Sequence, residues 1–135
     1  MFDHILVEKK GAVARVTINR PDKLNALNAK VVRELSDVFL GLQNVADGEE
    51  PTRCAILTGA GKAFVAGADI SEFETARTGD AAKAYDALNH AAFEALLGAK
   101  KPTIAMIEGF CLGVTRDGGK ESVRFAATVG SLACR

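Results

Sequence analysis

The sequence has little of what metal sites, disulfide scaffolds and membrane spans require. It contains no tryptophan, two histidines and three cysteines among 135 residues. Neither histidine stands at metal-ligand spacing from a cysteine or a carboxylate, so no metal site is predicted. The cysteines are odd in number and lack redox spacing, which predicts reduced thiols. No apolar run approaches the ~20 residues of a membrane span, and none is expected.

An excess of charge is also missing. The chain has 17 Lys and Arg residues against 17 Asp and Glu residues. This balance excludes a general electrostatic attraction to nucleic acid or to an anionic membrane surface. Residues 1–5, MFDHI, have neither the basic segment nor the apolar region of a signal peptide, so we expect a cytoplasmic protein.

The residues that are present have the balance of one globular domain. Apolar residues make up 48% of the chain and charged residues 25%, enough to build one core with a polar surface. Periodicity and turn residues predict strands at 4–8 and 12–20, a helix from Asn28 to about 46, a strand at 53–58, a helix at 81–98 and a strand at 103–109. This order favours an α/β fold with parallel strand pairing.

Two turns rich in small residues follow the apolar strands. The first is Ala66-Gly67-Ala68-Asp69, and the second is the segment GFCLG at 109–113. Both lie where parallel strands end, which is where open α/β sheets bind ligands, and their uncovered N–H groups could stabilise one developing oxyanion. Spacing alone favours a simpler alternative, in which both are tight strand-to-helix turns. Asp69 would then cap a helix beginning at Ile70, with Glu72 adding favourable charge to its first turn.

Three longer motifs favour the ligand-binding interpretation of these turns over the simpler alternative. They are NRPDKLNALN at 19–28, AFVAGADISEF at 63–73 and KPTIAMIEGFCLG at 101–113. In this order they resemble the crotonase superfamily, the enoyl-CoA hydratases and isomerases. The resemblance covers residues 1–113 and implies a crotonase-like N-terminal core, followed by a divergent tail at 114–135.

The resemblance implies a fold and a class of substrate. The implied fold is the α/β spiral of ββα units of the ClpP/crotonase type, truncated in this chain, and the family commonly assembles as trimers or hexamers. Its members bind acyl-CoA thioesters and stabilise the thioester enolate in an oxyanion hole of two backbone N–H groups. No cofactor is implied beyond the coenzyme A of the substrate itself.

The resemblance also implies which residues of this sequence form the site. Ala68 matches the first oxyanion-hole donor. Two further groups match the parts of the family site that bind the substrate: Lys23, Leu24 and Ala26 match the loop that packs on the CoA nucleotide and pantetheine, and Ala66, Asp69 and Ile70 match the lining of the acyl pocket.

The family pattern is lost after Gly113. Counting without gaps places Val114, or else Gly113, at the second oxyanion donor and Asp117 at a catalytic carboxylate. Two functions follow as alternatives. The first is an enoyl-CoA hydratase or isomerase, most simply hydrating 2-enoyl-CoA in fatty-acid degradation. The second is a truncated, catalytically inactive relative that serves only as a CoA-binding or partner-binding module.

Overall fold

The larger of two sheets contains the N-terminal hairpin and two further strands, both parallel to the second strand of the hairpin. The computed structural model describes residues 1–44, 47–75, 79–98 and 100–112. The strand order is β1-β2-β3-β5, with bounds β1 (Ile5–Lys10), β2 (Val13–Ile18), β3 (Cys54–Gly59) and β5 (Thr103–Ala105). β1 pairs with β2 antiparallel, whereas β2, β3 and β5 are parallel. The α/β architecture and the parallel pairing are therefore confirmed.

A second sheet contains two short parallel strands, β4 (Ala63–Ala66) and β6 (Phe110–Leu112). Ala66 at the end of β4 pairs with Leu112 at the end of β6. Neither strand was predicted, because the last residue of β4 and all of β6 had been assigned to the two turns of small residues. The pairing nevertheless brings the ends of those two segments side by side, as the prediction from sheet topology required.

The helices begin close to their predicted positions. α1 spans Ala29–Gly41, and the Asn28 side chain accepts a hydrogen bond of 2.8 Å from Val31 N–H, which is the predicted cap. α1 ends before residue 46, where the sequence placed its end. α2 spans Ile70–Thr75 and begins at the predicted residue, and α3 spans Gly79–Leu97.

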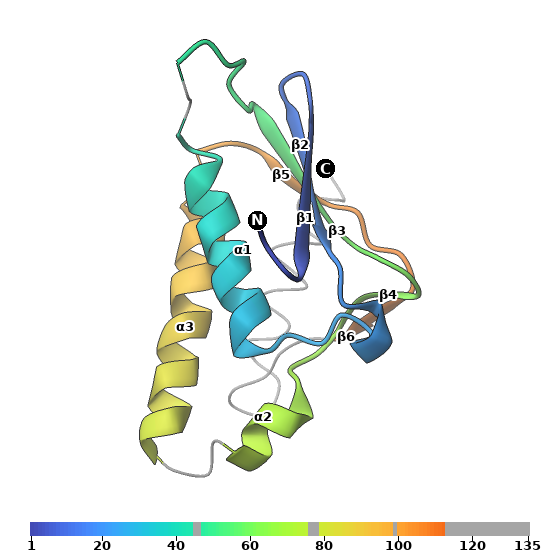
Figure 1. Ribbon diagram of the computed structural model, residues 1–135, viewed down its shortest axis with the longest axis vertical. Helices are drawn as coiled ribbons and strands as arrows, with labels where there is room; N and C mark the ends of the chain where they lie inside the picture. The colour runs from blue at the N-terminus through green and yellow to red at the C-terminus, as the bar shows by residue number, and fades with distance from the viewer. Residues whose placement is uncertain (45–46, 76–78, 99, 113–135) are drawn as a thin grey trace.

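The core lies between the larger sheet and one layer of helices. α1 and α3 lie side by side and cover one face of the sheet (Figure 1). β2 turns alternate residues toward them, and Ala14, Val16 and Ile18 have no exposed surface. The helical residues that meet this face are Val31, Leu35, Val38 and Phe39 of α1, with Leu88, Ala92 and Leu96 of α3 packed against the same cluster.

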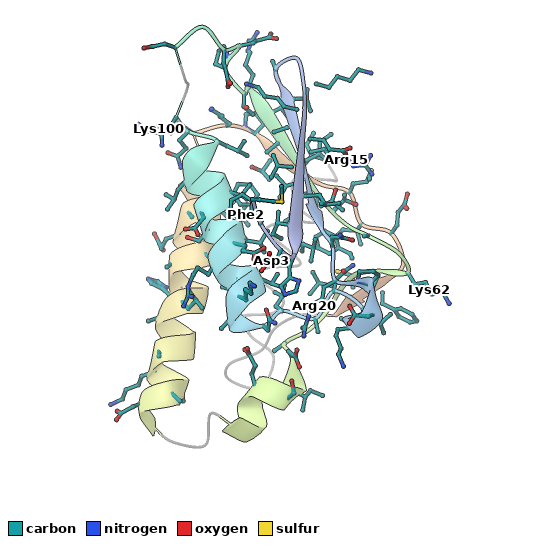
Figure 2. The ribbon with its side chains drawn as sticks, viewed as in Figure 1. Phe2, Asp3, Arg15, Arg20, Lys62 and Lys100 are labelled. Carbon is teal, nitrogen blue, oxygen red and sulfur yellow. The ribbon has the colours of Figure 1, made fainter. Side chains whose placement is uncertain are left out.

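The opposite face of the larger sheet carries exposed side chains. Arg15 projects from this face, away from α1 and α3 (Figure 2). Leu6, Val13 and Ile104 share the face and are 48%, 38% and 41% exposed. Within the described residues, none of the helices combines the length and the apolar character that crossing a bilayer demands.

Candidate active site

The turn of small residues at 66–69 lies against the loop that follows β2. Three backbone hydrogen bonds join the two segments. Ala66 N–H donates to Leu24 C=O at 3.1 Å, Leu27 N–H donates to Gly67 C=O at 2.8 Å, and Asp69 N–H donates to Leu27 C=O at 2.9 Å. The predicted acyl-pocket turn and the predicted CoA loop, 40 residues apart in sequence, therefore form one unit.

Gly67 gives this turn its path. Its φ of +104° lies in a region that residues with a side chain rarely adopt. Ala68 follows and forms an isolated parallel bridge with Leu27, in which the flanking groups of Gly67 and Asp69 bond to Leu27. Because hydrogen-bonding groups alternate in direction along an extended chain, the Ala68 N–H points away from Leu27. It donates to none of the residues that the structure describes.

The loop from Arg20 to Leu27 has an unusual backbone. A 3₁₀ turn at Pro21–Lys23 leads into two successive left-handed residues, Leu24 with φ +50° and Asn25 with φ +57°. Lys23 is exposed and Leu24 is 40% exposed, whereas Asn25 is completely buried. The loop thus presents Lys23 and Leu24 outward, as contacts with a bound ligand require.

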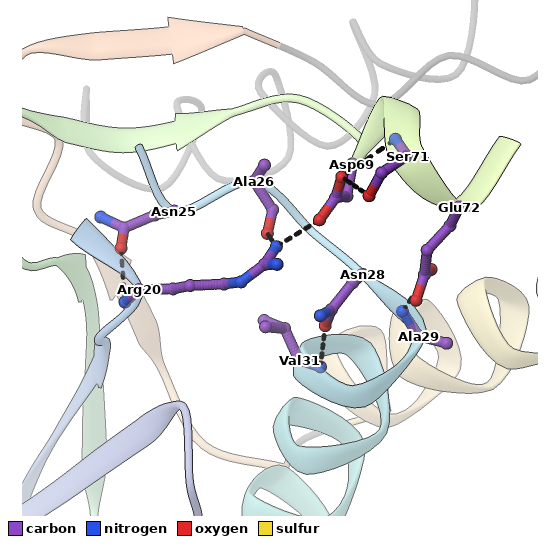
Figure 3. A network of polar contacts seen from close by, with 9 residues as sticks. All are labelled: Arg20, Asn25, Ala26, Asn28, Ala29, Val31, Asp69, Ser71 and Glu72. Atoms are coloured by element: carbon purple, nitrogen blue, oxygen red, sulfur yellow. Dashed lines mark hydrogen bonds and ion pairs between the residues drawn. The ribbon is translucent and has the colours of Figure 1, made fainter. Parts of the chain in front are cut away.

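Asp69 is held between two partners. Its Oδ2 accepts a hydrogen bond of 2.6 Å from Arg20 Nη1, and its Oδ1 accepts from Ser71 Oγ at 2.6 Å and from Ser71 N–H at 3.1 Å (Figure 3). The Ser71 and Arg20 hydrogen bonds hold the pKa of this carboxyl below its usual range. Asp69 is therefore an ionised anchor of the turn, and it caps α2 as the simpler alternative proposed.

Sequence reasoning missed the partners that hold this unit together. Arg20 and Asn25 stand inside the motif at 19–28, but their roles depend on segments 35 to 49 residues away. Glu72 was expected to act within its own helix. It lies in the first turn of α2, as expected, and its Oε2 also accepts a hydrogen bond of 2.8 Å from Ala29 N–H, at the first residue of α1.

The second loop approaches from β6. Gly109 has φ +73°, and a Cβ there would stand 1.9 Å from Lys62 C=O, so only glycine fits. Phe110 N–H then donates to Lys62 C=O at 3.2 Å, which starts the pairing of β6 with β4. The other predicted site residues of this loop, Gly113, Val114 and Asp117, lie outside the described residues.

Comparison with known proteins assigns the chain to a family. The family model described as Enoyl-CoA hydratase/isomerase matches residues 8–122. The chain belongs to the enoyl-CoA hydratase/isomerase family. This confirms the resemblance inferred from the three motifs, and the crotonase-like fold with it.

The relatives that match this chain are longer than the chain itself. The short-chain-enoyl-CoA hydratase of Clostridium acetobutylicum is 43% identical over 113 residues, which are 83% of this chain and 41% of the relative. A probable enoyl-CoA hydratase of Rhizobium meliloti is 38% identical, with the same coverage. The chain therefore spans about two fifths of the length of the curated relatives that it matches.

Solved structures agree with this assignment. The crystal structure of an enoyl-CoA hydratase/carnithine racemase from Magnetospirillum magneticum has a TM-score of 0.74 at 41% identity and covers 82% of this chain and 41% of its own. An enoyl-CoA hydratase from Bacillus anthracis has a TM-score of 0.73 at 30% identity, covering 82% and 42%. The family fold is thus present here in its matched part, and it is truncated relative to these structures.

Proposed function

We propose that this chain binds an acyl-CoA thioester and contributes to enolate stabilisation of the enoyl-CoA hydratase/isomerase type. The observation that carries the proposal is the Ala68 N–H, which points away from Leu27 and donates to no described residue. A thioester carbonyl gains negative charge on oxygen as it becomes an enolate. One fixed donor at that oxygen lowers the barrier by about 3–4 kcal/mol.

The remaining roles in this proposal follow the family motifs. Gly113 or Val114 would supply the second donor, and Asp117 would transfer the proton during syn addition of water to a 2-enoyl-CoA. Lys23, Leu24 and Ala26 would contact the CoA part, while Ala66, Asp69 and Ile70 would line the acyl pocket. Of these, Asp69 would act through its anchored position, because both carboxylate oxygens already accept hydrogen bonds.

The proposal extends to the setting of the reaction. The ligand is an acyl-CoA thioester, with no cofactor beyond its coenzyme A. Assembly into trimers or hexamers and a cytoplasmic location in fatty-acid degradation belong to the same proposal. It includes no nucleic-acid or membrane partner, because the chain has no net charge to attract either one.

A hydration assay tests the proposal directly. Crotonyl-CoA loses ultraviolet absorbance when water adds across its double bond, so turnover by the full chain is followed continuously. Ala68→Pro removes the proposed donor, whereas Ala68→Ser retains the N–H and serves as the matched control. We expect Ala68→Pro and Asp117→Asn each to lower the rate by about 10²-fold or more. Equal rates in Ala68→Pro and Ala68→Ser would contradict the donor role.

The second candidate is a binding module without catalysis. It is favoured by one observation, that the chain spans about 41% of the length of its relatives. This candidate predicts no hydration of crotonyl-CoA together with measurable binding of coenzyme A by calorimetry. Turnover that Asp117→Asn abolishes would eliminate it.

A further inference from the structure

Asn25 is the most completely buried polar side chain in the described part of the molecule. It has no exposed surface, and every hydrogen-bonding group of its side chain that the structure places has a partner. Oδ1 accepts from Arg20 N–H at 2.8 Å, while Nδ2 donates to Ala60 C=O at 2.8 Å and to Ala63 C=O at 2.7 Å. Because Ala60 and Ala63 flank the start of β4, Asn25 ties the loop to the strand that leads into the 66–69 turn.

Arg20 makes a second tie between the same two segments. Its Nη1 donates to Ala26 C=O at 3.1 Å and to Asp69 Oδ2 at 2.6 Å, so one guanidinium nitrogen touches both the loop and the turn (Figure 3). The Arg20 and Asp69 side chains are only 14% and 11% exposed. Limited contact with water strengthens such a pair and holds its geometry.

The side-chain contacts of Asn25 and Arg20 lie at opposite ends of the three backbone hydrogen bonds that join the loop to the 66–69 turn. Asn25 is fixed near Ala63, before the turn begins, and Arg20 is fixed at Asp69, where it ends. Between these ends lie the three backbone hydrogen bonds that leave Ala68 N–H pointing away from Leu27. Release of either end would let the turn slide or rotate relative to the loop. The direction of the Ala68 N–H depends on both ends.

We infer that Arg20 and Asn25 are positioning residues, a clamp that fixes the direction of Ala68 N–H relative to the loop carrying Lys23 and Leu24. The clamp sets the spacing between the place where a thioester carbonyl would lie and the surface where the CoA part would bind. A misplacement of about 1 Å between reacting groups costs about 10²-fold in rate. The ligand half of this inference rests on the proposed function, whereas its geometric half concerns the folded chain alone.

Nuclear magnetic resonance of the full chain tests the geometric half. The residual dipolar coupling of Ala68 N–H reports the direction of that bond, and amide exchange reports the Leu27 and Asp69 hydrogen bonds. Arg20→Lys keeps a positive charge beside Asp69, but the lysine nitrogen lies one bond nearer to the main chain than Arg Nη1. It therefore cannot hold Ala26 C=O and Asp69 Oδ2 in the geometry that the longer arginine allows. We expect this variant to change the Ala68 coupling and to speed exchange at Leu27 and Asp69 by about tenfold, with the fold retained.

Two further variants sharpen the result. Asn25→Asp keeps the shape of the side chain but replaces its donor group with oxygen facing two carbonyls, so the same reporters should change more strongly. Lys30→Ala breaks the Lys30–Asp3 ion pair on the surface of α1 and serves as the control that leaves Ala68 unchanged. A folded Arg20→Lys protein with the wild-type Ala68 coupling would overturn the inference.

Ligand binding separates this inference from the proposed function. If both are right, calorimetry with crotonyl-CoA gives a dissociation constant that rises about tenfold in Arg20→Lys and stays unchanged in Lys30→Ala. If the wild-type chain binds no crotonyl-CoA but Ala68 still responds to Arg20→Lys, the proposed function fails and the clamp stands. If the wild type binds and Arg20→Lys binds equally well, the clamp does not position the ligand.

Discussion

Gly67 determines the path of the 66–69 turn, here called the donor turn because it contains the proposed donor, Ala68 N–H. Its φ of +104° requires glycine, and the next residue is the proposed donor. A side chain here would either strain the backbone or change the angle, and a changed angle would redirect Ala68 N–H.

Gly67→Ala should therefore lower the free energy of unfolding by about 1–3 kcal/mol, the usual cost of backbone strain. Urea denaturation followed by circular dichroism measures this loss. Gly41→Ala is the matched control, because a Cβ at Gly41, the last residue of α1, would meet nothing within 4 Å. An equal loss in both variants would refute the role assigned to the angle of Gly67.

Asp69 makes the stability of the turn depend on pH. Its folded-state pKa lies below the ordinary value because of Ser71 and Arg20. The stability that its ionised form contributes is therefore complete above the unfolded pKa of about 4. That contribution is lost as the pH falls through the folded-state pKa.

Asp69→Asn should reduce the free energy of unfolding at pH 7 by about 1–3 kcal/mol, because it leaves the Arg20 guanidinium poorly paired. The stability difference from wild type should begin to narrow below pH 4, where the unfolded chain binds a proton at this carboxyl, and should vanish once the pH is below the folded-state pKa. Urea denaturation at pH 7 and pH 3 checks this, with the exposed Asp37→Asn on α1 as control. If Asp69→Asn and wild type differ in free energy of unfolding by the same amount at both pH values, the charge of Asp69 is not the cause of the loss.

Among the elements, the pairing of β4 with β6 depends on one close approach. The backbone of Gly109 passes so near Lys62 C=O that no Cβ fits. Gly109→Ala should separate the strands and lower the free energy of unfolding by about 3 kcal/mol or more. Gly79→Ala at the start of α3 meets open space and should change it by about 0.5 kcal/mol or less. Thermal denaturation of the two variants should differ clearly, and matching curves would contradict the packing argument.

Elements with a repeating pattern were predictable, and elements without one were not. β2 alternates buried and exposed residues over six positions, and α1 has a long apolar stripe after a capping Asn28. β4 and β6 contain four and three residues, too few to establish a period. Their residues are small or apolar and suit a turn equally well. Only the pairing of the two segments with each other identifies them as strands.

The site was predictable in part for the same reason. The motif at 63–73 located the turn and its cap, because both depend on neighbouring residues. Arg20 and Asn25 could not be assigned roles, because their partners at Asp69, Ala60 and Ala63 are brought near only by the fold. The direction of Ala68 N–H likewise comes from a bridge to Leu27 that no local pattern indicates.

At the scale of the whole molecule, the face of the larger sheet opposite α1 and α3 exposes apolar side chains. Leu6 and Ile104 lie on it, 48% and 41% exposed. Exposed apolar surface of this kind binds hydrophobic dyes and promotes association.

The double variant Leu6→Lys and Ile104→Lys should bind about half as much of the dye as wild type, since its apolar area falls. Its free energy of unfolding should change by about 1 kcal/mol or less, because neither side chain is in the core. Val16→Lys, on the covered face with no exposed surface, is the control and should unfold the chain. A wild-type protein that binds no dye would contradict this view of the sheet.

The clamp also determines when the site appears during folding. The Asn25 bonds to Ala60 and Ala63 span 35 and 38 residues, and the Arg20–Asp69 pair spans 49. Contacts this distant in sequence form late and slow the folding of a domain, because the chain must close large loops first. A helix such as α1 can form early, but the donor turn acquires its shape only when β2, β3 and β4 have docked. Partly folded chains therefore lack the site, and a ligand that binds it stabilises the whole fold against unfolding.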